Sequence, residues 1–230
     1  IKDFNLEIRK TERVGLIGRN GIGKSTLLKL IVGDLKADSG IIKIGNRVKI
    51  GYLSQGHEEL NDNFTPIDEL IDEFGITIER ARSELARLEI YSDVATKTIA
   101  SMSGGEKTRV ALAKIILTGA NFLILDEPTV GLDPKQIIEI RTLIKRLGKN
   151  HTVILSSHIL PEVQAVCDKI VVINKGSIVA NGNAETLARN LSADHKLIMH
   201  IEGGSEEIKK IILKYEPDAQ QLVPNQEPVA

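Results

Sequence analysis

The chain has 230 residues, 42% of them hydrophobic, so it is long enough to bury the core of one large domain. Its 30 Lys and Arg residues against 31 Asp and Glu give a net charge of -1, which lacks the basic footprint of proteins that bind duplex nucleic acid. Cys167 has no cysteine to pair with, and no segment has the pattern of a signal peptide, so we expect a cytoplasmic protein. The apolar runs fall far short of the roughly 20 residues that span a bilayer, so any membrane role is expected through a partner.

The first half of the chain begins with a pattern typical of nucleotide-binding folds. An apolar run at 14–18 precedes a glycine-rich loop, and the segment after the loop is apolar-periodic up to Gly33, which predicts strand, loop and helix. Residues 41–54 alternate around a turn with Asn and Gly, which predicts short antiparallel strands. Apolar residues recur at helical spacing over 66–90, and we expect 57–118 to form a helical insertion.

The second half predicts parallel strands and a closing hairpin. Continuous apolar runs at 121–128 and 151–158 suit parallel strands buried on both faces, with a helix over 134–147 between them. Residues 169–182 have the pattern of a hairpin. We therefore expect an α/β nucleotide-binding domain over 1–190, followed over 191–230 by a small appendage of one strand and one helix with a loose tail.

The segment GRNGIGKS at 18–25 satisfies the phosphate-binding pattern GxxxxGK[ST]. Gly18, Gly21 and Gly23 allow the loop to wrap its N–H groups around phosphates, while Lys24 neutralises the β and γ groups. The Ser25 hydroxyl is a ligand for Mg²⁺ in this pattern. A strand before the loop and a helix after it favour this interpretation over a chance glycine loop.

Polar residues end two of the predicted parallel strands. Asp126 follows the run FLIL, where it can reach the Mg²⁺ shell, and Glu127 beside it is a candidate base for the attacking water. His158 ends the next strand, and Gln55 follows an earlier one. Because parallel strands direct their carboxyl ends to one crevice, we expect Gly18, Asp126 and His158 to converge.

A second candidate for anion binding is SMSGGEKTRV at 101–110. Its glycine pair stands at a predicted helix start, where unsatisfied N–H groups can hold an anion. The same residues also suit an ordinary capping box made by Ser103 and Glu106, and both interpretations can hold together.

The order of GRNGIGKS, Gln55, MSGGE, FLILDEP, GLD at 131–133 and His158 resembles the nucleotide-binding domain of the ATP-binding cassette (ABC) family. The resemblance implies a P-loop ATPase with an antiparallel β portion and a helical subdomain over about 57–118. It implies that ATP is held by the loop residues Gly18, Asn20, Gly21, Gly23, Lys24, Ser25 and Thr26.

The same resemblance assigns roles to the remaining motifs. It implies that Ser103, Gly104 and Gly105 reach across a head-to-tail dimer to the γ-phosphate of the partner's ATP, and that Asp133 makes a second cross-dimer contact. Mg²⁺ would be held by Ser25, Gln55 and Asp126, and the catalytic residues would be Glu127, His158 and Gln55.

The resemblance is uneven along the chain. Up to the DEP triplet the sequence is similar to the F subfamily of soluble translation factors, whereas VGLDPKQ and the residues after it are similar to exporter-type cassettes. The chain is either a natural intermediate or a hybrid joined near 126–130. Family members stack adenine on an aromatic residue well ahead of the P-loop, and Phe4 is too near Gly18 for that role.

These patterns leave three functional alternatives. We favour the ATPase subunit of an ABC exporter, a homodimer or heterodimer of cassettes that reaches the membrane through a separate permease. The alternatives are a fragment of an F-subfamily translation factor, which would dock on the ribosome, and a hybrid cassette with no transport partner. The transported substrate would be selected by the permease.

Overall fold

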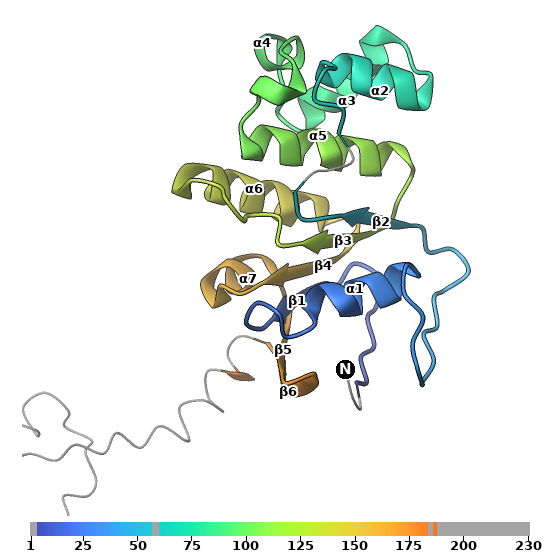
Figure 1. Ribbon diagram of the computed structural model, residues 1–230, viewed down its shortest axis with the longest axis vertical. Helices are drawn as coiled ribbons and strands as arrows, with labels where there is room; N and C mark the ends of the chain where they lie inside the picture. The colour runs from blue at the N-terminus through green and yellow to red at the C-terminus, as the bar shows by residue number, and fades with distance from the viewer. Residues whose placement is uncertain (1–3, 57–59, 184–185, 188–230) are drawn as a thin grey trace, which may run out of the picture. The chain divides into compact units, whose positions relative to one another are not determined.

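The computed structural model describes residues 4–56, 60–183 and 186–187, and within them one six-stranded sheet has the order β2-β3-β4-β1-β5-β6 (Figure 1). All neighbours from β2 to β5 are parallel, and β6 pairs antiparallel with β5. The strands are β1 Arg13–Ile17, β2 Ile50–Leu53, β3 Phe122–Asp126, β4 Thr152–Ser157, β5 Lys169–Asn174 and β6 Ser177–Gly182. The predicted parallel strands and closing hairpin are therefore present.

Alternate residues of the central strands enter two separate apolar cores. Ile124 and Ile154 pack with Leu27 and Leu28 of helix α1 (Lys24–Val32) on one face. Their neighbours in the strands pack on the other face with helices α5 (Gly104–Leu117), α6 (Pro134–Leu147) and α7 (Leu160–Val166). Both faces are covered, which explains why these strands are continuously apolar in sequence.

The antiparallel strands predicted for 41–54 are wrong. Only Ile50–Leu53 is a strand, and it pairs parallel with β3. The expected turn does form, because the Val48 N–H donates to the Gly45 carbonyl at 2.9 Å, but no ladder extends from it and Ile41 is 82% exposed. A two-stranded hairpin alone is marginally stable in water, whereas joining the edge of the sheet buries Leu53 completely. Among the described residues, antiparallel pairing is confined to β5 and β6.

The expected insertion is mainly helical over its described residues. It contains α2 (Pro66–Phe74), α3 (Ile78–Arg87), α4 (Ser92–Ala95), the 3₁₀ turn η1 (Ile99–Ser101) and α5. The periodic segment 66–90 is divided by Gly75, whose φ of 60° suits a helix C-terminus. The strand and helix predicted for 191–230 lie outside the described residues.

A buried ion pair joins α5 to α2 inside this helical layer. Lys114 Nζ lies 2.5 Å from Glu69 Oε1 and 2.7 Å from Glu73 Oε2. Burial favours the neutral amine, but hydrogen bonds to both carboxylates outweigh it and raise the pKa of Lys114 above its ordinary value. These contacts connect α2 to α5, the helix at whose start the SGGE motif lies.

Candidate functional site

The glycine-rich loop lies between β1 and α1 and folds around the side chain of Lys24. Lys24 Nζ donates to the carbonyl oxygens of Gly18 at 2.8 Å and Arg19 at 3.2 Å. Gly21 and Gly23 have φ values of 76° and 106°, which glycine adopts readily, and nothing lies within 4 Å of a Cβ built on Gly21. The loop therefore leaves open space over the N-terminus of α1.

The carboxyl ends of the parallel strands bring most of the predicted residues to one cleft of about 360 Å³, here called the first cleft. Gly18 and Asp126 adjoin residues of this cleft without lining it. Val130 is the lining residue that had not been predicted. The first cleft is lined by Asn20, Gly21, Gly23, Lys24, Ser25, Thr26, Gln55, Glu127, Val130 and His158.

Two hydroxyl groups hold the adjacent acids at the end of β3. Asp126 is 2% exposed and accepts hydrogen bonds from Ser156 Oγ at 2.6 Å and from Tyr52 OH at 3.3 Å. The N–H of Glu127 donates to the same Ser156 Oγ at 2.9 Å. Ser156 is therefore a positioning residue for both acids, although the sequence offered only its place in the run SSH as a signal.

Glu127 is 7% exposed, and its two carboxylate oxygens face different partners. Oε2 lies 2.8 Å from His158 Nδ1, and Oε1 lies 3.0 Å from Lys24 Nζ. The contact with Lys24 is close enough for an ion pair, yet Oε1 has no partner in regular hydrogen-bond geometry. This buried oxygen is thus available to a further donor in the cleft.

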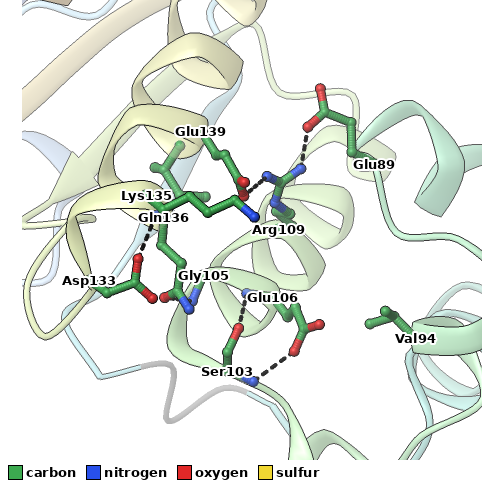
Figure 2. A pocket seen from close by; sticks show the side chains of 11 residues that line it. Glu89, Val94, Ser103, Gly105, Glu106, Arg109, Asp133, Lys135, Gln136 and Glu139 are labelled. Atoms are coloured by element: carbon green, nitrogen blue, oxygen red, sulfur yellow. Dashed lines mark hydrogen bonds and ion pairs between the residues drawn. The ribbon is translucent and has the colours of Figure 1, made fainter.

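The SGGE segment lies apart from these residues, in a second cleft of about 320 Å³ shown in Figure 2. Ser103 Oγ accepts from the N–H of Glu106 at 3.3 Å, and Glu106 Oε2 accepts from the N–H of Ser103 at 2.7 Å, so the predicted capping box is present. The second cleft is lined by Glu89, Val94, Ser103, Gly105, Glu106, Arg109, Asp133, Lys135, Gln136, Glu139 and Ile140.

The helix starts of α5 and α6 both open into the second cleft. Asp133 is the N-cap of α6, and its Oδ1 accepts from the N–H of Gln136 at 2.9 Å. Arg109 is 6% exposed and is held by carboxylates of Glu89 at 2.5 Å and Glu139 at 2.9 Å. Because these acids neutralise the guanidinium, the donors left for an anion in this cleft include the N–H groups of the α5 start and the exposed side chain of Lys135.

The structure divides the predicted site residues between the two clefts. The loop residues, Gln55, Glu127 and His158 surround the first, whereas Ser103, Gly105 and Asp133 line the second. Phe4 packs against the apolar core beside α1 and lines neither cleft. One chain therefore has two separate clefts, one at the glycine-rich loop and one at the SGGE helix start.

Comparisons with known proteins show the family of this chain. A family model described as ABC transporter matches residues 1–130. The ABC transporter ATP-binding protein NatA of Bacillus subtilis is 32% identical over 205 residues, which cover 81% of this chain and 83% of NatA. Mouse ATP-binding cassette sub-family F member 3 is 39% identical over 168 residues, which cover 72% of this chain but 23% of the relative. The chain spans less than a quarter of that relative and of similarly matched proteins.

A solved structure also shares the fold. The dimeric ATP-binding cassette MJ0796, in a post-hydrolysis state bound to ADP and Pi, superposes with a TM-score of 0.67 and 26% identity, covering 78% of this chain and 88% of that one. Among the residues that our structure describes, no helix is both long and apolar enough to cross a membrane. The motifs, the fold and the matches agree, and the chain belongs to the ABC transporter family of ATPases.

Proposed function

We propose that the chain hydrolyses ATP as a head-to-tail dimer and energises an exporter through a separate membrane permease. The observation that carries this proposal is the separation of the two clefts. The first holds the P-loop, an acid and a histidine but has no SGGE residue, and the second holds the SGGE helix start but has no P-loop. Two chains in head-to-tail order would bring each first cleft against a second cleft.

In the first cleft, the glycine-rich loop would bind ATP and the carboxylate of Glu127 would accept a proton. Phosphate oxygens would replace the carbonyl and carboxylate partners of Lys24, which frees Glu127 Oε1 to accept a proton. Glu127 would take a proton from water, whose oxygen forms a bond to the γ-phosphorus. The bond from that phosphorus to its bridging oxygen would break to give ADP and phosphate. His158, which lies 2.8 Å from the second oxygen of Glu127, would orient the carboxylate.

The oxygen atoms of Ser25, Gln55 and Asp126 are donors of the kind that Mg²⁺ prefers. It prefers a few protein oxygens together with substrate phosphates rather than an all-protein cage. The candidate ligands are one hydroxyl, one amide and one carboxylate, a donor set that suits such sharing. Ser25, Gln55 and Asp126 would hold the ion, and it would neutralise charge on the phosphates.

Transport is favoured over translation because the matched proteins differ in how completely they align. NatA, named as an ABC transporter ATP-binding protein, is matched over 83% of its length, whereas the sub-family F relative is matched over 23%. The F-type alternative still has specific support, because its identity of 39% is higher than the 32% of NatA. The third alternative, a hybrid cassette without a transport partner, would resemble both NatA and the sub-family F relative in sequence.

The charge of residues 57–100, the first part of the insertion, helps to choose between these alternatives. Docking on ribosomal RNA needs clustered Lys and Arg that displace counterions. Residues 57–100 contain more acids than bases, the bases being Arg80, Arg82, Arg87 and Lys97 and the acids Glu58, Glu59, Asp62, Asp68, Glu69, Asp72, Glu73, Glu79, Glu84, Glu89 and Asp93. This segment therefore favours a protein partner over RNA.

Sedimentation with ribosomes tests the choice. The Glu127→Gln variant, which should retain ATP, is mixed with ribosomes and ATP at low and high salt. We expect the protein to stay in the supernatant at both, and to co-purify in detergent with a permease from its native membrane. Sedimentation at low salt that is lost at high salt would favour the translation-factor alternative instead.

A further inference from the structure

Gln136 in the first turn of α6 covers part of the SGGE helix start. Its Oε1 accepts a hydrogen bond from the Gly105 N–H at 3.3 Å. A Cβ built on Gly105 would lie 3.3 Å from Oε1 and 3.4 Å from Cβ and Cδ of Gln136, so the side chain lies directly over this glycine (Figure 2). Gly105 is consequently buried, although the neighbouring Gly104 is exposed.

The N–H groups at the start of α5 are therefore not equally available to an anion. The Ser103 and Glu106 N–H groups are used by the capping box, and the Gly105 N–H is used by Gln136. Among the residues described, the exposed Gly104 N–H has no hydrogen-bond partner. A phosphate from a second chain could reach Gly104 directly but could reach the Gly105 N–H only if Gln136 moved.

We propose that the Gln136 amide oxygen occupies the Gly105 N–H in place of a phosphate oxygen and must leave it when the composite site closes. The inference rests on the proposed function, because it takes the second cleft as the site for the partner's ATP. Gln136 is then a residue that sets the affinity between two nucleotide-loaded chains. It does not touch the chain's own nucleotide, because it lines only the second cleft.

The local packing explains how a single side chain can have this effect. A Cβ on Gly104 would lie 2.7 Å from Leu132 Cδ2, so the α5 start is already in close contact with the turn before α6. Gln136 is tied to the same turn by its backbone, whose N–H donates to Asp133. The backbone of both helix starts can thus stay in place while the half-buried amide rotates away. A neutral amide is a weaker competitor for an N–H group than a charged phosphate.

Two substitutions of Gln136 distinguish competition with phosphate for the Gly105 N–H from structural support of the α5 start. Gln136→Met keeps the length and the packing over Gly105 but removes the acceptor, so the N–H is free for phosphate. Gln136→Glu keeps an acceptor, strengthens it and adds a negative charge where phosphate must arrive. Competition predicts opposite effects of these two variants on the dimer, whereas loss of structural support predicts weakening in both.

The experiment measures the ATP concentration that gives half-maximal dimer by sedimentation of the full chain carrying Glu127→Gln, with Mg²⁺ present. We expect Gln136→Met to lower this concentration by about threefold and Gln136→Glu to raise it by about tenfold, which are the sizes expected for one hydrogen bond and one charge at a helix start. Gln164→Glu, the same change at an exposed position of α7, is the matched control and should cause no shift.

Each other outcome has a definite meaning. If Gln136→Met and Gln136→Glu both weaken the dimer, or if neither shifts it, Gln136 does not compete with phosphate and the inference is wrong. If the Glu127→Gln protein fails to dimerise with ATP while binding ATP as a monomer, the head-to-tail function itself is wrong and the inference fails with it. Thermal unfolding of each variant identifies any loss of dimer that comes from unfolding.

Discussion

Glu127 occupies a backbone conformation that few non-glycine residues adopt. Its φ is 50°, in the left-handed region that costs a side-chain-bearing residue about 1–3 kcal/mol. The Ser156 hydroxyl holds its N–H, while His158 and Lys24 hold the carboxylate from two sides. The surrounding contacts thus keep the acid at one position in the first cleft, as expected of a residue that must meet a water molecule in a fixed geometry.

Replacing the acid and the cation should affect different steps. Glu127→Gln keeps the shape but cannot accept a proton, so we expect single-turnover hydrolysis to fall by about 10²- to 10⁴-fold while ATP still binds. Lys24→Ala removes the cation at the phosphates, so ATP binding should fail. Lys29→Ala, on the exposed side of α1, is the control for losing a lysine. A Glu127→Gln protein that hydrolyses ATP at the parent rate would remove Glu127 from the role of base.

Gly15 shows how a glycine can be required by packing alone. A Cβ at this position of β1 would lie 1.7 Å from Val163 Cγ1 of α7, which is impossible without movement. We expect Gly15→Ala to lower the free energy of unfolding by about 1–3 kcal/mol, measured with urea. Adding Val163→Ala should recover part of the stability by making room. Gly45→Ala, in the exposed turn, is the control.

At the scale of elements, an ion pair joins the first residue of β1 to the residue before β5. Arg13 donates to Asp168 through Nε at 2.9 Å and through Nη2 at 2.5 Å. This side-chain hydrogen bonding holds the pKa of Asp168 below its ordinary value. Because the pKa is lowered in the folded state, the pair stabilises the protein above the unfolded pKa of about 3.9, and that stability is lost as pH falls through the folded pKa.

The sign of this linkage gives a measurable pH dependence. Asp168→Asn should be less stable than the parent at pH 7, and the difference should shrink as the pH falls below about 4. Thermal unfolding across that range measures it, with Asp38→Asn on an exposed loop as the control for the change in charge. A difference that stays constant down to pH 2 would mean that Asp168 acts through packing rather than through its charge.

Local signals were sufficient for some elements and not for others. Asp133, Pro134 and the apolar spacing after them define α6, whose bounds were predicted as 134–147 and are found as Pro134–Leu147. Residues 41–48 alternate in an equally clear local pattern, yet they form no strand and pair with no other segment of the sheet. Strand pairing depends on distant residues, so it could not be read from the segment itself.

The same distinction holds for the site. Lys24, Glu127 and His158 could be predicted because their motifs and strand ends place them in one cleft. Ser156 and Gln136 could not, because each acts through a contact with a residue about 30 positions away, Asp126 or Gly105. No periodicity or motif records such a contact. Residues whose proposed role depends on a contact with a distant residue are therefore the part of the site that needed the structure.

At the scale of the whole molecule, the dimer proposal requires that each ATP site use one P-loop and the other chain's Ser103. Lys24→Ala damages the P-loop contribution, and Ser103→Arg blocks the helix start with a bulky cation without touching its own P-loop. Placed on opposite chains of a heterodimer, the two changes fall in the same composite site and leave the other site intact. Placed on the same chain, they damage both sites once.

Hydrolysis by tagged heterodimers therefore distinguishes action across the dimer from action within a chain. If Ser103 acts on the partner's ATP, the opposite-chain pairing keeps up to half of the parent activity and the same-chain pairing falls well below it. If Ser103 acts on its own chain's ATP, the order is reversed, because the same-chain pairing then leaves one chain undamaged. Lys24→Ala on one chain with a normal partner is the reference for a single damaged site. Equal activity in both pairings would mean that the sites do not work independently and would leave no support for a composite site of this kind.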